Sequence, residues 1–216
     1  MRELLRVHGI EQTTEAFRRK LIRISDAISF DPSYIAAVIS FETAGTFSPT
    51  IKNPRSGFVG LIQFGPDAAR ALGTSISQLL DMTATKQLSY VKEYFLHYKK
   101  RIRPAEPLDY YLAVFSPKFV GSPASAAMYS LGEPAYEQNK GLDVDGDGVI
   151  TVGDVAARFS RVIGDARARE PLIVDMDAES GSKTGWYALG GVVALGITIW
   201  TLSRMQHTMH REIADG

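Results

Sequence analysis

The chain has 216 residues, equal numbers of basic and acidic side chains (24 of each) and no cysteine. The balanced charge gives no support to nucleic-acid binding, and the lack of cysteine excludes disulfide scaffolds, thiolate-bound zinc and thiol nucleophiles. The amino-terminal stretch MRELLRVHGIEQTTEAFRRKL is charged throughout and lacks the apolar segment of a secretory signal peptide.

The spacing of apolar residues predicts a mostly α fold. An amphipathic helix is expected over residues 14–29, and a second helix begins at Pro32, with Asp31 as its N-cap. A third helix is expected from Pro66 to Gly73. Further helical stretches are predicted over residues 76–100, 107–116 and 123–131. We find no alternating strand pattern of useful length.

One acidic residue lies on the apolar stripe of the second helix. Ile35, Val38 and Ile39 mark the side expected to face the core, and Glu42 continues this series one further turn along. The acid is therefore expected to point inward at the last helical turn. Burial and the negative end of the helix dipole both favour the protonated form of such a carboxyl group, as a general acid requires. Spacing alone favours a solvated glutamate at a frayed helix end.

The stretch GFVGLIQF follows a polar loop rich in turn-forming residues. Gly60 would allow the backbone to approach a ligand closely, and Gln63 places an amide among apolar residues. Together with Glu42, these residues outline a cleft that contains one acid and one amide.

The motifs ETAGTFSP, GLIQF and ARALG occur in this order and resemble those of the lytic transglycosylase SLT domain family. The similarity covers residues 15–140 and implies a lysozyme-like, mostly helical fold. It places the catalytic acid of the family at Glu42. It also places the serine that follows this acid at Thr43 and the family's glutamine at Gln63, which implies that both residues bind substrate together with Gly60.

The third motif of the family is matched loosely at residues 112–116. Phe115 stands where the family has a tyrosine, and its ring is expected to stack on a sugar face. Ser116 stands where the family has an asparagine, so contacts to the N-acetyl or peptide groups of the substrate differ. Tyr136 either corresponds to a late tyrosine of the family or is a core aromatic residue.

The resemblance implies an enzyme that cleaves peptidoglycan between N-acetylmuramic acid and N-acetylglucosamine and leaves a 1,6-anhydro sugar. One carboxyl group would suffice, in contrast to the carboxylate pair of ordinary glycosidases. The stretch SGFVGLIQFGPDAARALG is similar to transglycosylases of phage particles, which implies a virion protein that opens the host wall during entry. A hydrolytic muramidase and an inactive structural virion protein are the alternatives.

The sequence DVDGDGVITVGD at residues 143–154 has the spacing of an EF-hand calcium loop. The predicted ligands are Asp143, Asp145, Asp147, Val149 (through its carbonyl), Thr151 and Asp154. Asp154 stands at the last position of the loop, where glutamate is usual and reaches farther. Because three neighbouring aspartates repel one another without a cation, a structural calcium ion is favoured over a metal-free turn.

The uncharged stretch WYALGGVVALGITIWTL has the length and the terminal aromatic residues of a membrane span. A buried core helix is the alternative. The sequence is thus expected to comprise a transglycosylase domain, a calcium loop with its exit helix, a tether, a membrane helix and a tail, at residues 1–140, 141–164, 165–184, 185–204 and 205–216.

Basic residues after the span place the carboxyl terminus in the cytoplasm and the Glu42 domain outside, on the side of the peptidoglycan. A phage particle would bring such a protein to the host periplasm without a signal peptide, either in an internal membrane or by injection. Its expected partners are therefore glycan strands, a membrane and other virion proteins.

Overall fold

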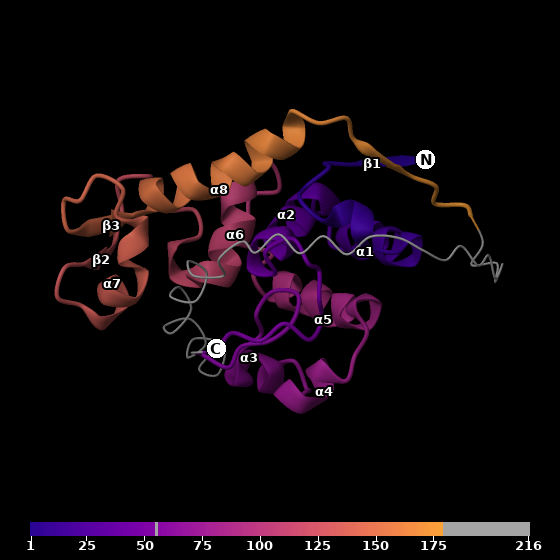
Figure 1. Cartoon of the computed structure of the whole chain (residues 1–216), viewed down its shortest axis with the longest axis horizontal. Coiled ribbons are helices and arrows are strands. Elements are labelled where there is room, and N and C mark those ends of the chain that lie inside the picture. The colour runs from indigo at the N-terminus through magenta and orange to yellow at the C-terminus, as the bar shows by residue number, and fades with distance from the viewer. Residues whose placement is uncertain (55, 179–216) are drawn as a thin grey trace, which may run out of the picture.

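The computed structural model describes residues 1–54 and 56–178 (Figure 1). The predicted membrane helix and tail lie outside the described residues. Within the described part of the chain, no helix is both long and apolar enough to cross a membrane. These residues form mainly helices with two small two-stranded sheets, which confirms the predicted mostly α fold.

The helices follow one another with short strands at both ends and in the second half of the chain. In chain order the elements are β1 (Arg2–Leu4), η1 (Ile10–Gln12), α1 (Glu15–Ala27), α2 (Pro32–Glu42), α3 (Pro66–Ala71), α4 (Ile76–Leu80), α5 (Ala84–His97), α6 (Pro107–Phe115), η2 (Pro117–Phe119), β2 (Ala127–Ser130), α7 (Pro134–Asn139), η3 (Lys140–Leu142), β3 (Val149–Thr151), α8 (Val152–Arg167) and β4 (Leu172–Val174), where η denotes a short 3-10 helix.

Helix α2 is the buried centre of the fold. It begins as predicted, with Pro32 in its first turn and the Asp31 carboxylate accepting a hydrogen bond from the backbone N–H of Ser33 at 2.8 Å. The predicted core residues Ile35, Val38 and Ile39 are fully buried. Helices α1, α6 and α8 all contact α2, so it is covered on several sides.

A stack of aromatic rings joins α2, α6 and α8. The ring of Tyr111 on α6 lies parallel to those of Phe115 and Phe159, with centroid distances of 5.5 and 4.8 Å. Phe41 on α2 meets Tyr111 edge-on at 4.9 Å. Because buried aromatic pairs of this kind stabilise cores beyond their buried area, the stack fixes the last turn of α2 against its neighbours.

Several parts of the chain differ from the sequence prediction. The helix predicted over residues 123–131 is wrong: residues 127–130 form β2, which pairs antiparallel with β3. The predicted helical stretch 76–100 is divided into α4 and α5, because the side chains of Ser75 and Thr83 cap separate helix starts. Tertiary pairing and local caps outweigh intrinsic propensity in both places.

The described part of the expected tether is folded. Helix α8 continues through Arg167, and β4 pairs antiparallel with β1 at the amino terminus. Val174 is buried with Leu4 and Ile22 in a small second core. Figure 1 shows α8 running along one side of the molecule, from β2, β3 and α7 to the paired β1 and β4. The three apolar residues of β4 form too short a pattern to predict a strand from the sequence.

A buried carboxylate holds the connection between α5 and α6. Asp109 is fully buried and accepts hydrogen bonds from the backbone N, Nε and Nη2 of Arg103 at 2.9, 2.7 and 2.8 Å. The backbone N–H of Gly121 donates a further one at 3.3 Å. Burial raises the pKa of Asp109, but the hydrogen bonds and the charge of Arg103 together lower it below its ordinary value.

We expect Asp109 to make the stability of the fold sensitive to acid. Because its folded-state pKa is depressed, its stabilisation is fully present above the unfolded-state pKa of about 3.9 and is lost as the pH falls through the folded-state pKa. Asp109→Asn should lower the free energy of unfolding by about 2 kcal/mol at neutral pH. Denaturant unfolding at several pH values should show this difference shrinking below pH ~4.

The matched control is Asp67→Asn, which removes an ion pair with Arg70 at the protein surface. It should change the free energy of unfolding by less than about 1 kcal/mol. A difference between Asp109→Asn and the wild type that is as large in acid as at neutral pH would contradict the role assigned to Asp109.

Candidate active site

Glu42 is the last residue of α2 and its side chain points inward. The residue is only 8% exposed, and Thr43, which caps the helix, is fully buried. The prediction that the acid faces the core is therefore confirmed.

Two buried tyrosines lie within the electrostatic reach of Glu42. Burial raises the pKa of Tyr94 and of Tyr111 well above the ordinary value, and the negative charge of Glu42 adds to the shift at both hydroxyls. The hydroxyl of Tyr94 also donates a hydrogen bond to the carbonyl of Ala113 at 3.0 Å. Both phenols therefore stay protonated, and Glu42 lies close to α5 and α6 in a region of low polarity.

The loop after Glu42 contains residues in the left-handed backbone region. Ala44 and Phe47 have φ angles of +51° and +52°, which residues other than glycine seldom adopt. Backbone strain of this kind is concentrated at functional sites, where the surrounding structure holds the residues in these conformations. The hydroxyl of Thr43 supports the loop, since it donates to the carbonyl of Ile39 at 2.7 Å and accepts from the backbone N–H of Phe47 at 3.0 Å.

Thr43 was predicted to bind substrate, but the structure engages its hydroxyl inside the protein. Gly60 was expected to make room for a ligand, but the space beside it is taken by the side chain of Gln87. A Cβ atom added to Gly60 would lie 2.4 Å from Oε1 of Gln87, and Gly60 has a φ of +76°. The glycine is therefore required by Gln87 and by its own backbone conformation. The expected close approach of a ligand is not needed to explain it.

Gln63 lies in the turn that Gly60 begins. It has a φ of +52°, is almost fully buried, and donates a hydrogen bond from Nε2 to the carbonyl of Gly60 at 3.2 Å. The next residue, Phe64, packs edge-on against Tyr94 at a centroid distance of 6.4 Å. Through Tyr94, the turn that carries Gln63 is thus packed in the same region as Glu42.

Sequence reasoning missed Gln87, which connects the two segments that carry Glu42 and Gln63. This fully buried amide on α5 donates to the carbonyls of Pro49 and Leu79 at 2.8 and 2.7 Å and accepts from the backbone N–H of Leu61 at 3.1 Å. Pro49 ends the ETAGTFSP motif, and Leu61 lies within GLIQF. The available signal was a glutamine on the apolar stripe of a predicted helix, together with Val91 and Tyr94.

Phe115 and Ser116 are core residues in this structure. Phe115 is fully buried, and its ring is covered by Tyr111 on one face and met edge-on by Tyr129. It therefore has no open face on which a sugar could stack. The hydroxyl of Ser116 is also buried and pairs with that of Tyr129 at 3.2 Å. Neither side chain is available for the substrate contact that was expected of it.

Tyr136 lies beside the predicted calcium loop. Its hydroxyl donates to Oδ2 of Asp143 at 2.6 Å. This hydrogen bond is the main reason why the pKa of Tyr136 is raised to about 12 and the pKa of Asp143 is lowered. Tyr136 thus orients the first predicted metal ligand. It is also buried in the core, as the alternative of a core aromatic residue predicted.

The predicted calcium loop brings three carboxylates together. One oxygen from each of Asp143, Asp145 and Asp147 lies within 4.8 Å of the other two. Backbone N–H groups of the loop hold all three side chains: Gly148 donates to Asp143 at 3.0 Å, Asp147 to Asp145 at 3.3 Å and Val149 to Asp147 at 2.8 Å. Carboxylate oxygens that converge in this way suit a hard divalent cation such as Ca²⁺.

The remaining predicted ligands take part in secondary structure. The backbone N–H of Thr151 donates to Oδ2 of Asp154 at 2.9 Å, and the hydroxyl of Thr151 accepts from the backbone N–H of Asp154 at 3.2 Å. This capping box starts α8. Val149 and Thr151 belong to β3, which pairs with β2 of the same chain. The strand within the loop, β3, therefore pairs with β2. In paired EF-hands, a second calcium loop makes this contact.

We next compared the chain with known proteins. No family model matches it, and neither a curated protein nor a solved structure does. Function is therefore inferred from the residues and their geometry. The structure brings Glu42, Tyr94, Tyr111 and the Gln63 turn into one region, and it places the three aspartates of the calcium loop in another lobe, with β2, β3 and α7.

Proposed function

We propose that this chain is a peptidoglycan lytic transglycosylase in which Glu42 acts first as general acid and then as general base. The observation that carries the proposal is the burial of the Glu42 side chain at the end of α2, beside the protonated hydroxyls of Tyr94 and Tyr111. The other buried carboxylate among the described residues belongs to Asp109, which is bound by Arg103. A mechanism with a single catalytic carboxyl group fits this arrangement.

In the first step, the carboxyl group of Glu42 donates its proton to the glycosidic oxygen between N-acetylmuramic acid and N-acetylglucosamine, and the bond from this oxygen to C1 breaks. The carbonyl oxygen of the substrate's own 2-acetamido group stabilises the positive charge at C1. In the second step, the Glu42 carboxylate takes the proton of the muramic acid C6 hydroxyl while O6 bonds to C1. Glu42 is protonated again, and no water is consumed.

Digestion of purified peptidoglycan by the full chain in detergent tests the proposal. We expect the turbidity of a cell-wall suspension to fall and soluble muropeptides to appear. A protein that clears no cell wall under any condition in which it is folded would contradict the proposal. That outcome would favour the inactive virion protein, a reading that gains some support from the burial of Phe115 and Ser116.

The proposed setting is a phage particle that carries the enzyme to the host wall. It is supported by the sequence alone: the similarity of residues 56–73 to virion transglycosylases, and the uncharged stretch at residues 186–202, which lies outside the described residues. In this setting a single carboxyl-terminal helix would hold the protein in a membrane, with the Glu42 domain on the side of the peptidoglycan.

We also propose that the loop at residues 143–154 binds one Ca²⁺ ion with a structural role. Asp143, Asp145 and Asp147 would hold the ion, because their carboxylate oxygens already converge. The ion would neutralise their mutual repulsion and fix the lobe of α7, β2 and β3 at the start of α8. It would take no part in the cleavage of the glycan.

Calcium is expected to raise the unfolding temperature of the full chain. At a Ca²⁺ concentration about 100-fold above the Kd, binding to the folded state adds about 2.7 kcal/mol to the free energy of unfolding. Asp145→Asn should abolish most of this effect, whereas Asp175→Asn, at an exposed residue elsewhere in the chain, should leave it unchanged. Calorimetry that detects neither heat nor a change in melting on addition of Ca²⁺ would refute the site.

A further inference from the structure

A cavity of about 300 Å³ lies beside the proposed active site, between the end of α2, the segment after β1 and helix α8. Phe41 and Ala44, the residues on either side of the Glu42–Thr43 pair, line it. Arg158 lines its other wall from α8. The positive charge of Arg158 acts on the hydroxyl of Tyr111, as the negative charge of Glu42 does, so the cavity adjoins the Glu42 region.

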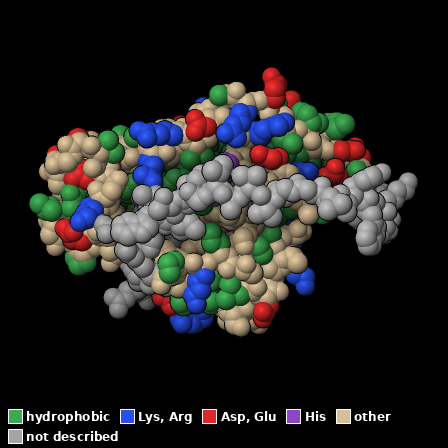
Figure 2. All heavy atoms as spheres, viewed as in Figure 1, with side chains coloured by type: hydrophobic (Ala, Val, Ile, Leu, Met, Phe, Trp, Pro, Cys, Tyr) green, Lys and Arg blue, Asp and Glu red, His purple; other side chains and the backbone are tan. Residues whose placement is uncertain are grey.

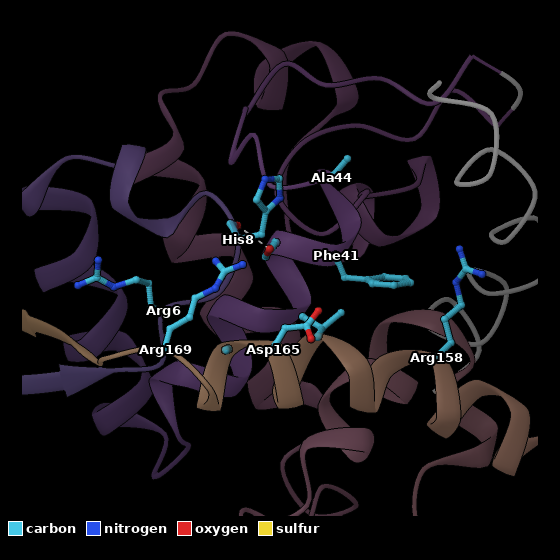
Figure 3. A pocket seen from close by; sticks show the side chains of 10 residues that line it. Arg6, His8, Phe41, Ala44, Arg158, Asp165 and Arg169 are labelled. Atoms are coloured by element: carbon cyan, nitrogen blue, oxygen red, sulfur yellow. Dashed lines mark hydrogen bonds between the residues drawn. The ribbon is translucent and has the colours of Figure 1, made fainter. Parts of the chain in front are cut away.

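The cavity is basic and has an apolar floor. Three arginines line it, Arg6, Arg158 and Arg169, against one carboxylate, that of Asp165. Figure 3 shows the side chain of Phe41 between those of Arg158 and Arg169. Asp165 points from α8 toward the same space. Figure 2 shows Lys and Arg side chains, with some Asp and Glu side chains among them, along the edge of the molecule that α8 forms. Guanidinium groups bind carboxylates and phosphates through paired hydrogen bonds.

Arg158 lines this cavity and has one donor without a hydrogen-bond partner among the described residues. Its Nε atom is buried and makes no hydrogen bond within the described part of the chain. Leaving such a donor unpaired costs free energy that an anionic acceptor would recover. Arg6, in contrast, already donates from Nε to the carbonyl of Glu170 at 3.0 Å, which orients its side chain at the opposite end of the cavity from Arg158.

The lining favours a peptide carboxylate over a bare phosphate. Phe41 and Val162 offer apolar contact, and Asp165 can accept a hydrogen bond from a peptide N–H or an amine, groups that inorganic phosphate lacks. Arg158 and Arg169 lie eleven residues apart (169 − 158) along α8 and the residues just after it, or about 16 Å at helical rise. An extended peptide of about three to five residues spans roughly 10–18 Å.

We propose that this cavity binds the acidic stem peptide attached to the muramic acid of the glycan strand, with Arg158 and Arg169 holding its carboxylates. The identity of the ligand rests on the proposed function, whereas the cavity and its charge do not. The cavity would select glycan that carries its peptides and would align the muramic acid with Glu42.

Binding is measured with the Glu42→Gln variant of the full chain in detergent, because this variant should not cut the glycan. The probes are a soluble glycan fragment with its stem peptides, the same fragment with the peptides removed, the free stem peptide, and inorganic phosphate. We expect removal of the peptides to weaken binding about tenfold or more, as for the loss of charged hydrogen bonds. Arg158→Gln should weaken binding of the peptide-bearing fragment by the same factor as removal of the peptides does. It should change binding of the bare fragment less than about twofold.

Two further variants make the test decisive. Arg169→Gln, at an exposed residue that should tolerate substitution, is expected to give the same pattern. Arg161→Gln removes an exposed charge of the same helix that does not line the cavity, and it should change nothing. Equal binding of the two fragments, equal losses on both in Arg158→Gln, or competition by phosphate as strong as by the free peptide would each overturn the proposal.

Failure of the proposed function would give a different result. Cleavage by the wild type is assayed separately from binding, and in that case the wild type would cut neither fragment. Binding of the free stem peptide that is lost in Arg158→Gln would still support the cavity as a carboxylate-peptide site. Cleavage of both fragments at equal rates, unaffected by Arg158→Gln and Arg169→Gln, would uphold the enzyme and exclude the peptide site.

Discussion

Glu42→Gln should reduce the rate of peptidoglycan cleavage at least about a thousandfold while leaving the fold intact. General acid–base catalysis contributes about 10²–10⁴ in rate, and here one group serves in both steps. Glutamine has nearly the same shape as glutamic acid but cannot donate a proton to the glycosidic oxygen. Release of soluble muropeptides from purified cell wall, followed by chromatography, measures the effect.

The unfolding temperature should change by only a few degrees, because glutamine keeps the packing of a buried side chain at the end of α2. Glu93→Gln is the matched control, since Glu93 is an exposed residue of α5 that pairs with Lys92. It should cut cell wall at the wild-type rate. A Glu42→Gln protein that keeps more than about a tenth of the activity would rule out Glu42 as the catalytic acid.

Gln87→Ala should destabilise the fold and weaken substrate binding together. The substitution leaves the carbonyls of Pro49 and Leu79 and the N–H of Leu61 without their buried partner, and each unsatisfied group costs about 1–3 kcal/mol. We expect a loss of about 3 kcal/mol or more in the free energy of unfolding, measured with denaturant. Because Gln87 joins the Glu42 loop to the Gln63 turn, the KM for glycan should also rise.

The activity of Gln87→Ala has to be measured well below its own unfolding temperature, so that the rise in KM reports on positioning. Gln78→Ala is the control, because Gln78 is exposed on α4 and hydrogen-bonds through Oε1 to the hydroxyl of Thr74. It should change the free energy of unfolding by less than about 0.5 kcal/mol. Equal stability of the two variants would show that the three contacts of Gln87 contribute little.

The sequence predicted the helices with clear caps and apolar stripes. The helix from Pro32 begins at its Asp31 cap and carries Glu42 inward, because helix caps and periodicity depend on neighbouring residues only. The strands β1 to β4 of the described residues were all missed, since each depends on pairing with a segment far along the chain. Such short strands leave no period that could be recognised in the sequence.

Within the site, the convergence of the aspartates was predictable from local spacing. The inward position of Glu42 followed from the apolar stripe of α2 together with the motifs that come after it, since spacing alone did not decide it. The roles of Thr43 and Gly60 were not, because each is set by a long-range partner or by loop geometry. The burial of Phe115 depends on Tyr111 and on the packing of α6 against α8, which the sequence does not specify locally. Gln87 was overlooked for the same reason.

The most direct test of the proposed function is mass spectrometry of the muropeptides that the full chain releases from purified peptidoglycan. The single-carboxyl mechanism at Glu42 predicts products that end in 1,6-anhydro-N-acetylmuramic acid, each lighter by one water than the product of hydrolysis. Products with reducing N-acetylmuramic acid ends would show that water attacks C1 and that the enzyme is a muramidase. The absence of any soluble muropeptide from a folded protein would contradict catalysis at Glu42 altogether.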